Sequence, residues 1–426
     1  MTIAILILIM LVLLAIRVPV WITLLAISLG YMLFEGGGGG PQVVQRLTSG
    51  LDSFPLLAVP FFIFAGIIMA GGGIAERMMA FATSLVGHFR GGLAQVNVLN
   101  SLLIGGMSGS ANADAAIDAK ILVPIMRKQG YTNAFASAIS VASGGISPIL
   151  PPSIGLILYG VLAGVSIGDL FIAGVIPGIL IAVALSITVW ILARIHDFPR
   201  ANDKFPPFRE IWLSFRKAFF ALLMPVLLLV GLRLGVFTPT ELGAVAVIYA
   251  LVLGLFVFKE ITWRDIPRLL REAVLTTAVV MIIIASASVF GIVVAYERIP
   301  DQLSSFLYGI SDNPIVIVLV INVILLVLGI FLESSSLMII LVPVLAPIAV
   351  MTGIDPVQFG VIIVLNLTIG ALTPPVGTVV YTVAAITGVS IPAFVKAFIP
   401  LFIALVAVLM LVTFVPLLTI WLPSVL

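Results

Sequence analysis

Two stretches decide the fold of this chain: Pro151-Pro152-Ser-Ile-Gly-Leu-Ile-Leu-Tyr159 and Pro374-Pro375-Val-Gly-Thr-Val-Val-Tyr381. Each begins with a proline pair inside an otherwise apolar segment. Such pairs are rare in helices because proline lacks an N–H donor and clashes with the preceding turn. The stretches align with one residue of slip and occupy corresponding helices of the two halves of the sequence. The match predicts an internal repeat in which one helix of each half is broken.

The composition is that of a membrane protein. Of the 426 residues, 62% are hydrophobic and 9% are charged, whereas soluble domains carry about 25% charged residues. Apolar runs of about 20 residues recur along the chain, and each can span roughly 30 Å of hydrocarbon. The absence of cysteine excludes disulfides and thiolate chemistry. Thr2 to Ile16 lacks a basic leader and a cleavage site, so we expect a retained helix instead of a signal peptide.

Two basic stretches predict the orientation. Arg194–Lys217 and Lys259–Glu272 flank a predicted helical hairpin, Phe219–Leu232 and Leu242–Phe258, so they lie on the same side. Their excess of Lys and Arg predicts that this side is cytoplasmic. Both termini are then periplasmic, in a protein of the bacterial inner membrane. On this map the basic residues outside the cytoplasm are Arg46, Arg233 and Arg298.

The crossings divide the chain into two predicted repeats. The first, residues 1–217, contains scaffold helices (1–90), a re-entrant hairpin (91–126), a broken helix (134–163) and a further helix (170–191). The second, residues 218–426, contains scaffold helices (218–312), a re-entrant hairpin (314–350), a broken helix (359–386) and a last helix (398–422). An odd number of crossings per repeat inverts the second. We therefore predict an all-α polytopic membrane protein with two inverted repeats.

Two amphipathic segments accompany these crossings. Residues 74–89 and 299–310 carry apolar side chains at helical spacing, which predicts helices lying in the membrane interface. The Gly36–Gly40 run is expected to be a flexible loop on the outside, and Arg194–Lys217 a cytoplasmic loop.

Four segments at membrane depth are predicted to be unwound. The tips of the two hairpins are Gly105–Asp114 and Gly329–Ser336, and the crossing helices break at Ser143–Pro152 and Asn366–Pro375. About 12 apolar-leaning residues flank each tip, which gives legs of roughly 18 Å, half a membrane. Unwound backbone at this depth must be buried in protein or line a wet cavity.

The unwound segments favour a transport site. Freed carbonyls and Ser, Thr and Asn side chains offer oxygen ligands to sodium, and half-helix N-termini suit a carboxylate. Any one segment could instead serve only close packing or a kink, but two symmetric pairs favour function. Asp114 and Glu333 lie where the return helices begin. Each could bind a cation or a proton, and we favour helix capping for both.

These segments together resemble a known family. The tip Gly105–Asp114, the Ser143–Ile154 segment, the Glu333–Ser335 hairpin and the Thr373–Gly377 segment are similar to the large membrane subunit of TRAP (tripartite ATP-independent periplasmic) transporters. The resemblance covers nearly the whole chain. It implies an elevator-type transporter that takes up carboxylates, such as C4-dicarboxylates or sialic acid, by sodium symport. It also implies two partners, a small four-helix membrane subunit and a periplasmic substrate-binding protein. No nucleic-acid partner is expected.

The resemblance also implies site residues. One sodium site would use Ser108, Ser110, Asn112, Gly145, Ser147, Pro148 and Pro151. A second would use Glu333, Ser334, Ser335, Thr368, Gly370 and Thr373. Substrate would lie between the tips, at Ser108, Gly109, Ser110, Asn112, Ser153, Ser335, Ser336 and Thr378.

Three other functions are compatible with parts of the sequence. Gly106-Met-Ser108-Gly109 matches a motif of intramembrane serine proteases, but neither histidine, His88 or His196, falls within a predicted span to act as the base. We therefore do not expect an enzyme. A stand-alone organic-anion carrier coupled to sodium or protons remains open. A channel is less expected, since it does not need paired half-helices around a substrate.

Overall fold

The computed structural model describes residues 2–16, 18–34, 40–202, 204–311 and 313–425. Over these residues the protein is helical, apart from turns, loops and one isolated bridge between Arg90 and Arg200. Arg17 and Gly36–Gly39, most of the predicted glycine loop, lie outside the described residues.

The first half contains eleven helical elements in the described ranges. They are α1 (Thr2–Ala15), α2 (Val20–Phe34), α3 (Gly40–Ser49), the 3-10 turn η1 (Phe54–Leu57), α4 (Ala58–Gly71), α5 (Ile74–Val86), α6 (Gly92–Ser108), α7 (Ala111–Lys128), α8 (Asn133–Gly144), α9 (Ile154–Ala163) and α10 (Ile167–Ile195).

The second half continues in the same manner. Its elements are α11 (Phe208–Arg233), α12 (Pro239–Val252), the π-helical turn η2 (Leu253–Val257), α13 (Ile266–Tyr296), α14 (Ile299–Ile310), α15 (Pro314–Phe331), α16 (Ser334–Met351), α17 (Pro356–Ala371), α18 (Thr378–Thr387), α19 (Ile391–Phe414) and α20 (Leu417–Val425).

The helices are those of a multi-pass membrane protein. Eight helical segments in the described part of the chain are long and apolar enough to cross a membrane. Many large apolar side chains point outward, among them Ile187 on α10, Val230 on α11 and Val279 on α13. Outward-facing apolar side chains of this kind are typical of helices that span a membrane.

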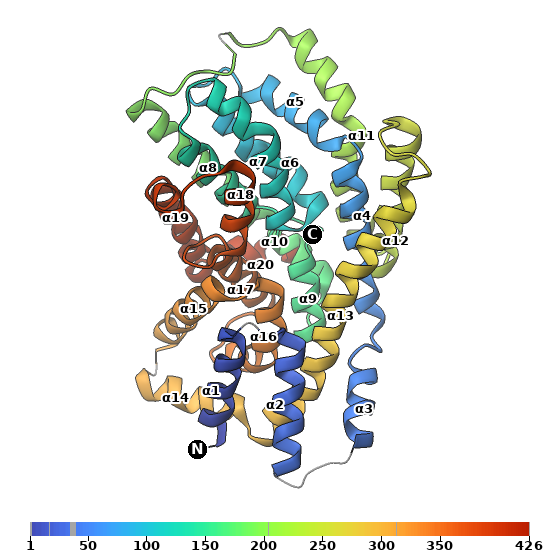
Figure 1. Cartoon of the computed structure of the whole chain (residues 1–426), viewed down its shortest axis with the longest axis vertical. Helices are drawn as coiled ribbons and strands as arrows, with labels where there is room; N and C mark the ends of the chain where they lie inside the picture. The colour runs from blue at the N-terminus through green and yellow to red at the C-terminus, as the bar shows by residue number, and fades with distance from the viewer. Residues whose placement is uncertain (1, 17, 35–39, 203, 312, 426) are drawn as a thin grey trace.

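The order of elements recurs in the two halves. A long helix (α4 or α13) is followed by an amphipathic helix (α5 or α14), a helical hairpin (α6–α7 or α15–α16), a broken helix (α8/α9 or α17/α18) and a long helix (α10 or α19). Figure 1 shows α5 near one end of the long axis and α14 near the other. Both helices are broken as predicted, and each break contains a cis Pro-Pro bond, at Pro151-Pro152 and at Pro374-Pro375. The predicted start of the second break is wrong, because α17 continues through Asn366 to Ala371 and only the residues next to the proline pair leave the helix.

The hairpin tips are shorter than predicted. Helical hydrogen bonding continues through Ser108 and resumes at Ala111, and in the second hairpin it pauses only at Leu332 and Glu333. The predicted legs of about 12 residues are therefore wrong, because the legs are helices of 17 and 18 residues in the first hairpin and 18 each in the second. Gly109 makes the sharp first turn possible, since its φ of 58° is open to glycine.

Other boundaries also differ from the prediction. The basic stretch Arg194–Lys217 is a loop only in part, since α10 runs to Ile195 and α11 begins at Phe208. The last helix, predicted over 398–422, is two helices, because α19 ends at Phe414 before Pro416 and α20 follows. Proline cannot donate the helical N–H, so the helix stops there.

Candidate functional site

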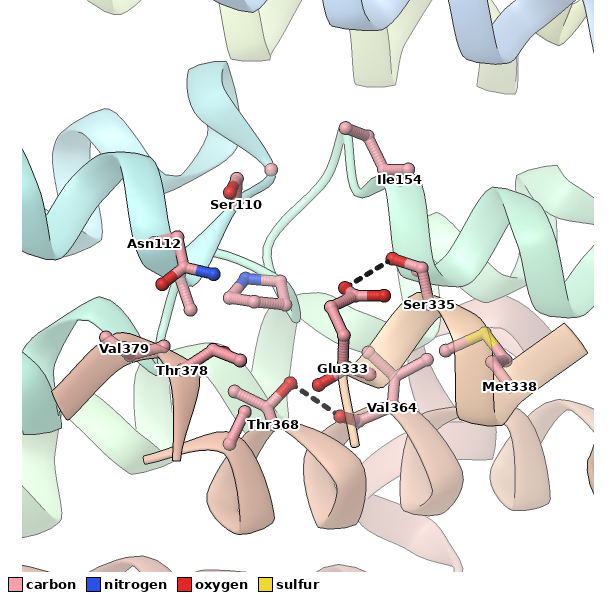
Figure 2. Close-up of a pocket in the computed structure, with 16 residues that line it drawn as sticks. Ser110, Asn112, Ile154, Glu333, Ser335, Met338, Val364, Thr368, Thr378 and Val379 are labelled. Carbon is pink, nitrogen blue, oxygen red and sulfur yellow. Dashed lines mark hydrogen bonds between the residues drawn. The ribbon is translucent and has the colours of Figure 1, made fainter. Parts of the chain in front are cut away.

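Both hairpin tips and both broken helices meet at one central cavity. Figure 2 shows the first tip, with Ser110 and Asn112, facing the second tip, with Glu333 and Ser335. The cavity measures about 100 Å³. It is lined by Gly109, Ser110, Ala111, Asn112, Pro148, Ile154, Gly155, Glu333, Ser334, Ser335, Met338, Val364, Thr368, Ala371, Thr378 and Val379. Residues more than 200 positions apart thus form one site.

The first tip is held by a serine cap and a buried carboxylate. Ser110 caps α7, with its Oγ accepting from the Ala113 amide at 3.4 Å. Asp114, predicted as a cap, does not cap the helix. Its Oδ2 accepts from the Ser147 hydroxyl at 2.7 Å, across to the first break. Asp114 is fully buried, and its Oδ1 has no hydrogen-bond partner among the described residues. A buried carboxylate oxygen with no donor suits either a cation or a proton.

A second buried carboxylate lies one turn further along α7. Asp118 accepts from Asn100 Nδ2 at 2.7 Å and from Ser101 Oγ at 3.2 Å, both on α6. These polar residues were not among the predicted site residues. Their signal was the presence of Asn and Ser within an apolar helix, where each needs a partner.

The second tip is capped as predicted. Glu333 precedes α16, and its Oε2 accepts from the Ser336 amide at 2.9 Å, while Oε1 accepts from the Ser335 hydroxyl at 2.9 Å. Ser334 Oγ donates to the Leu367 carbonyl at 3.1 Å, which joins the tip to α17. Both Glu333 oxygens are therefore engaged within the tip itself.

Each hairpin is also attached to its broken helix by an asparagine. In the first half, Asn97 Nδ2 donates to Ser140 Oγ at 2.8 Å, and Ser143 Oγ donates to Asn97 Oδ1 at 2.5 Å. In the second half, Asn366 Nδ2 donates to Asn322 Oδ1 at 2.8 Å. The hairpin asparagine is thus common to both halves, and Asn366 takes the place of the two serines in the second half.

The broken helices present backbone groups to the cavity. Ser153 caps α9, accepting from the Leu156 amide at 3.1 Å and donating to the Pro148 carbonyl. At α18 the N-cap is Gly377, which has no side chain to accept from the first amides. Thr378 and Val379, the first residues of α18, line the cavity. This helix N-terminus can therefore accept an anion.

The predicted site residues divide into two groups. Those lining the central cavity are Gly109, Ser110, Asn112, Pro148, Glu333, Ser334, Ser335, Thr368 and Thr378. Those outside its lining are Ser108, Gly145, Ser147, Pro151, Ser153, Ser336, Gly370 and Thr373.

Several residues of the second group lie behind the cavity. A Cβ at Gly145 would lie 2.7 Å from Leu372 Cδ1, so the two breaks touch there. A Cβ at Gly106 would lie 2.6 Å from the Pro151 carbonyl oxygen, which places that carbonyl against the first tip. Thr373 points elsewhere, into an apolar groove beside α19, and its hydroxyl donates to the Ile369 carbonyl at 2.7 Å.

The lining of the cavity contains no lysine or arginine. Glu333 is the one charged residue among the lining residues, and the remaining polar atoms are hydroxyls, an amide and backbone groups. The described residues also hold no cluster of three or more His, Cys, Asp or Glu side chains that could bind a metal. Neutral oxygen donors of this kind suit a hard cation such as sodium better than a soft metal ion.

Comparisons with known proteins identify the family. The family model described as "Tripartite ATP-independent periplasmic transporter, DctM component" matches residues 7–418. The chain is 42% identical to the sialic acid TRAP transporter large permease protein SiaM of Vibrio cholerae, over 95% of each protein. It is 36% identical to the C4-dicarboxylate TRAP transporter large permease protein DctM of Rhodobacter capsulatus, over 90% of each.

A solved structure shares the fold. The YdaH transporter of Alcanivorax borkumensis superposes with a TM-score of 0.54 at 15% identity, covering 90% of this chain and 88% of that one. The family model and the fold are those of a multi-pass membrane transporter. The chain belongs to the DctM family, the large permease proteins of the TRAP transporters.

Proposed function

We propose that this large permease protein imports an organic acid together with sodium ions across the bacterial inner membrane. It acts with a small four-helix membrane subunit and a periplasmic substrate-binding protein. The acid is of the C4-dicarboxylate or sialic acid type, because relatives named for those substrates share 36% to 42% identity with this chain.

The charge of the central cavity carries the proposal. An organic acid is an anion, yet the lining holds Glu333 and no basic side chain. An anion in such a place needs positive charge from another source. The N-terminus of α18 supplies part of it, and co-transported cations supply the rest. The proposed sodium ions would thus supply positive charge to the cavity as well as a driving force.

We propose two sodium positions on the basis of the oxygen donors. The first lies between Ser110 and Asn112 of the first tip and the first break, with the unpartnered Asp114 Oδ1 behind it. The second lies between Ser334 of the second tip and Thr368 of α17, one turn before the second break. The acid lies between the tips, against the first turn of α18.

Transport occurs by an elevator movement of two inverted repeats. The hairpins and broken helices move as one unit against the scaffold helices and the small subunit. One charge crossing 100 mV releases about 2.3 kcal/mol, and a tenfold concentration difference adds about 1.4 kcal/mol. Two sodium ions thus supply on the order of 7 kcal/mol, enough to concentrate an anionic acid strongly.

Uptake into proteoliposomes tests the proposal. The chain would be reconstituted with its small membrane subunit, and the periplasmic protein would be added outside with a panel of labelled mono- and dicarboxylic acids. We expect uptake of one acid class that requires the periplasmic protein. Uptake that ignores the periplasmic protein would indicate a stand-alone carrier, and failure to take up any acid would contradict the proposed substrate class.

A further inference from the structure

A second cavity begins where the central cavity ends. It measures about 540 Å³ and lies between the scaffold helices α4 and α13 and the hairpin helix α7. It shares Ser110 and Ile154 with the central cavity. Its outer part is lined by Lys120 on α7 and by Arg268 and Glu272 on α13. We call this cavity the vestibule.

The vestibule leads toward the predicted cytoplasmic side. Arg268 and Glu272 belong to the basic stretch Lys259–Glu272 that predicts the cytoplasmic orientation. Lys120 is ten positions after Ser110 on α7, which places it roughly 15 Å along the helix from the first tip. An anion leaving the central cavity by this route therefore meets its first basic side chain at Lys120.

Lys120 is free to attract an anion. It is exposed, and it forms no ion pair among the described residues. Arg268 Nη2 lies 3.5 Å from Asp265 Oδ1, and the Arg268 side chain is 72% exposed. This surface ion pair is therefore weak. Glu272 opposes one of the two positive charges, which leaves the vestibule lining with a net charge of one positive unit. A cleft with low-dielectric walls focuses such a charge on a passing anion.

Basic residues are common at cytoplasmic edges because they orient the protein. Lys120 differs from those residues by its place, since the cavity that it lines also contains the tip hydroxyls of Ser108 and Ser110. Lys128, on the same helix and also exposed, does not line the vestibule. The pair Lys120 and Lys128 thus separates an effect of the cavity from an effect of orientation.

We propose that the vestibule is a second, weak binding site for the carboxylate substrate, in which Lys120, supported by Arg268, holds the acid on its way to the cytoplasm. The inference rests on the proposed import of an organic acid. Lys120 belongs to the hairpin and Arg268 to the scaffold, so the site has both its charges only when the hairpin stands as it does in this structure. The carboxylate is held after it leaves the central cavity and before it reaches bulk solvent.

Inhibition of uptake by internal acid tests the proposal. Proteoliposomes of neutral lipid, holding the large and small subunits in one orientation, would be preloaded with the transported acid, and initial uptake would be measured with the periplasmic protein outside. Half-inhibition of uptake should need an internal acid concentration about three to five times higher in Lys120→Gln than in the wild type, because one surface ion pair is lost. Raising the salt concentration should shrink the difference. Lys120→Arg should behave as the wild type.

The controls are Lys128→Gln and Arg271→Gln, which remove nearby charges outside the vestibule lining and should leave that concentration unchanged. The external concentration for half-maximal uptake should stay constant in every variant. Equal behaviour of Lys120→Gln and Lys128→Gln would overturn the proposal, and so would an effect of Lys120→Gln confined to vesicles containing anionic lipid, which would assign the site to a lipid headgroup. A wild type that takes up no acid would instead overturn the proposed function.

Discussion

Gly370 lies directly against Gly329: a Cβ on Gly370 would stand 2.6 Å from the Cα of Gly329. Gly329 is in the last turn of the first leg of the second hairpin, and Gly370 is in the last turn of α17 before the break. The first half has a similar approach, since a Cβ on Gly105 would stand 3.0 Å from Ser147 Cα. Hairpin and broken helix therefore pack backbone against backbone in both halves, close to the proposed sodium positions.

Gly370→Ala should destabilise the protein by about 1–3 kcal/mol, since an added methyl group would have to displace helical backbone. Thermal unfolding of the purified large and small subunits would show a lowered transition temperature. Gly291→Ala is the matched control, because Gly291 is also helical and has open space at its Cβ position. Equal stability of the two variants would show that the contact between Gly370 and Gly329 is looser than described.

Asp114→Asn should raise the sodium concentration needed for half-maximal uptake by roughly tenfold, because groups that support a metal ligand typically contribute that much to affinity. Ser147→Ala should have a similar effect, since the two side chains are hydrogen-bonded at 2.7 Å. In the double variant the effects should be less than additive. Sodium titrations of uptake measure all three. Unchanged sodium dependence in Asp114→Asn would remove this carboxylate from the proposed site.

Glu333→Ala should cost about 1 kcal/mol of stability, because α16 loses the acceptor for its Ser336 amide. Glu333→Asp should keep most of that stability, since Asp is also a good N-cap residue. Thermal unfolding with and without sodium separates two roles. If Glu333 acts only as a helix cap, Glu333→Ala should lower the transition temperature equally with and without sodium. If sodium no longer stabilises the variant, Glu333 is an ion ligand.

Asn366→Ala should destabilise the second half by about 1–3 kcal/mol, because it leaves the buried Asn322 oxygen without its donor. The double variant Asn322→Leu with Asn366→Leu should lose less stability than the sum of the losses in Asn322→Leu and Asn366→Leu alone. The transition temperatures of the wild type, these two single variants and the double variant measure the coupling. Purely additive effects would contradict a hydrogen bond between the two side chains.

Much of the fold could be predicted from the sequence because its signals are local. Proline pairs, apolar runs of membrane length and amphipathic spacing each follow from a short stretch, and the first break and the amphipathic helices α5 and α14 have close to the predicted bounds. The second break begins six residues later than predicted, because α17 continues to Ala371. The predicted tips are too long, because Gly and Ser suggest unwound backbone. Gly105 and Ser108 instead remain helical and allow close packing.

The partners of buried polar groups could not be predicted. Whether Asp114 caps its own helix or reaches Ser147 depends on how the hairpin lies against the first break, which is a matter of packing between distant segments. The apolar part of the cavity was missed for the same reason. Met338, Val364 and Val379 line the cavity. In an apolar helix the sequence does not indicate which apolar residues face a cavity and which face a neighbouring helix or lipid.

The most direct test of the central claim is acid uptake under an imposed sodium gradient. Proteoliposomes with the large and small subunits and the external periplasmic protein would be compared in sodium chloride and in choline chloride of equal ionic strength. The account predicts uptake that rises with the inward sodium gradient and is abolished in choline. Undiminished uptake in choline would contradict it, because sodium would then not be the cation that accompanies the acid in the cavity beside Glu333.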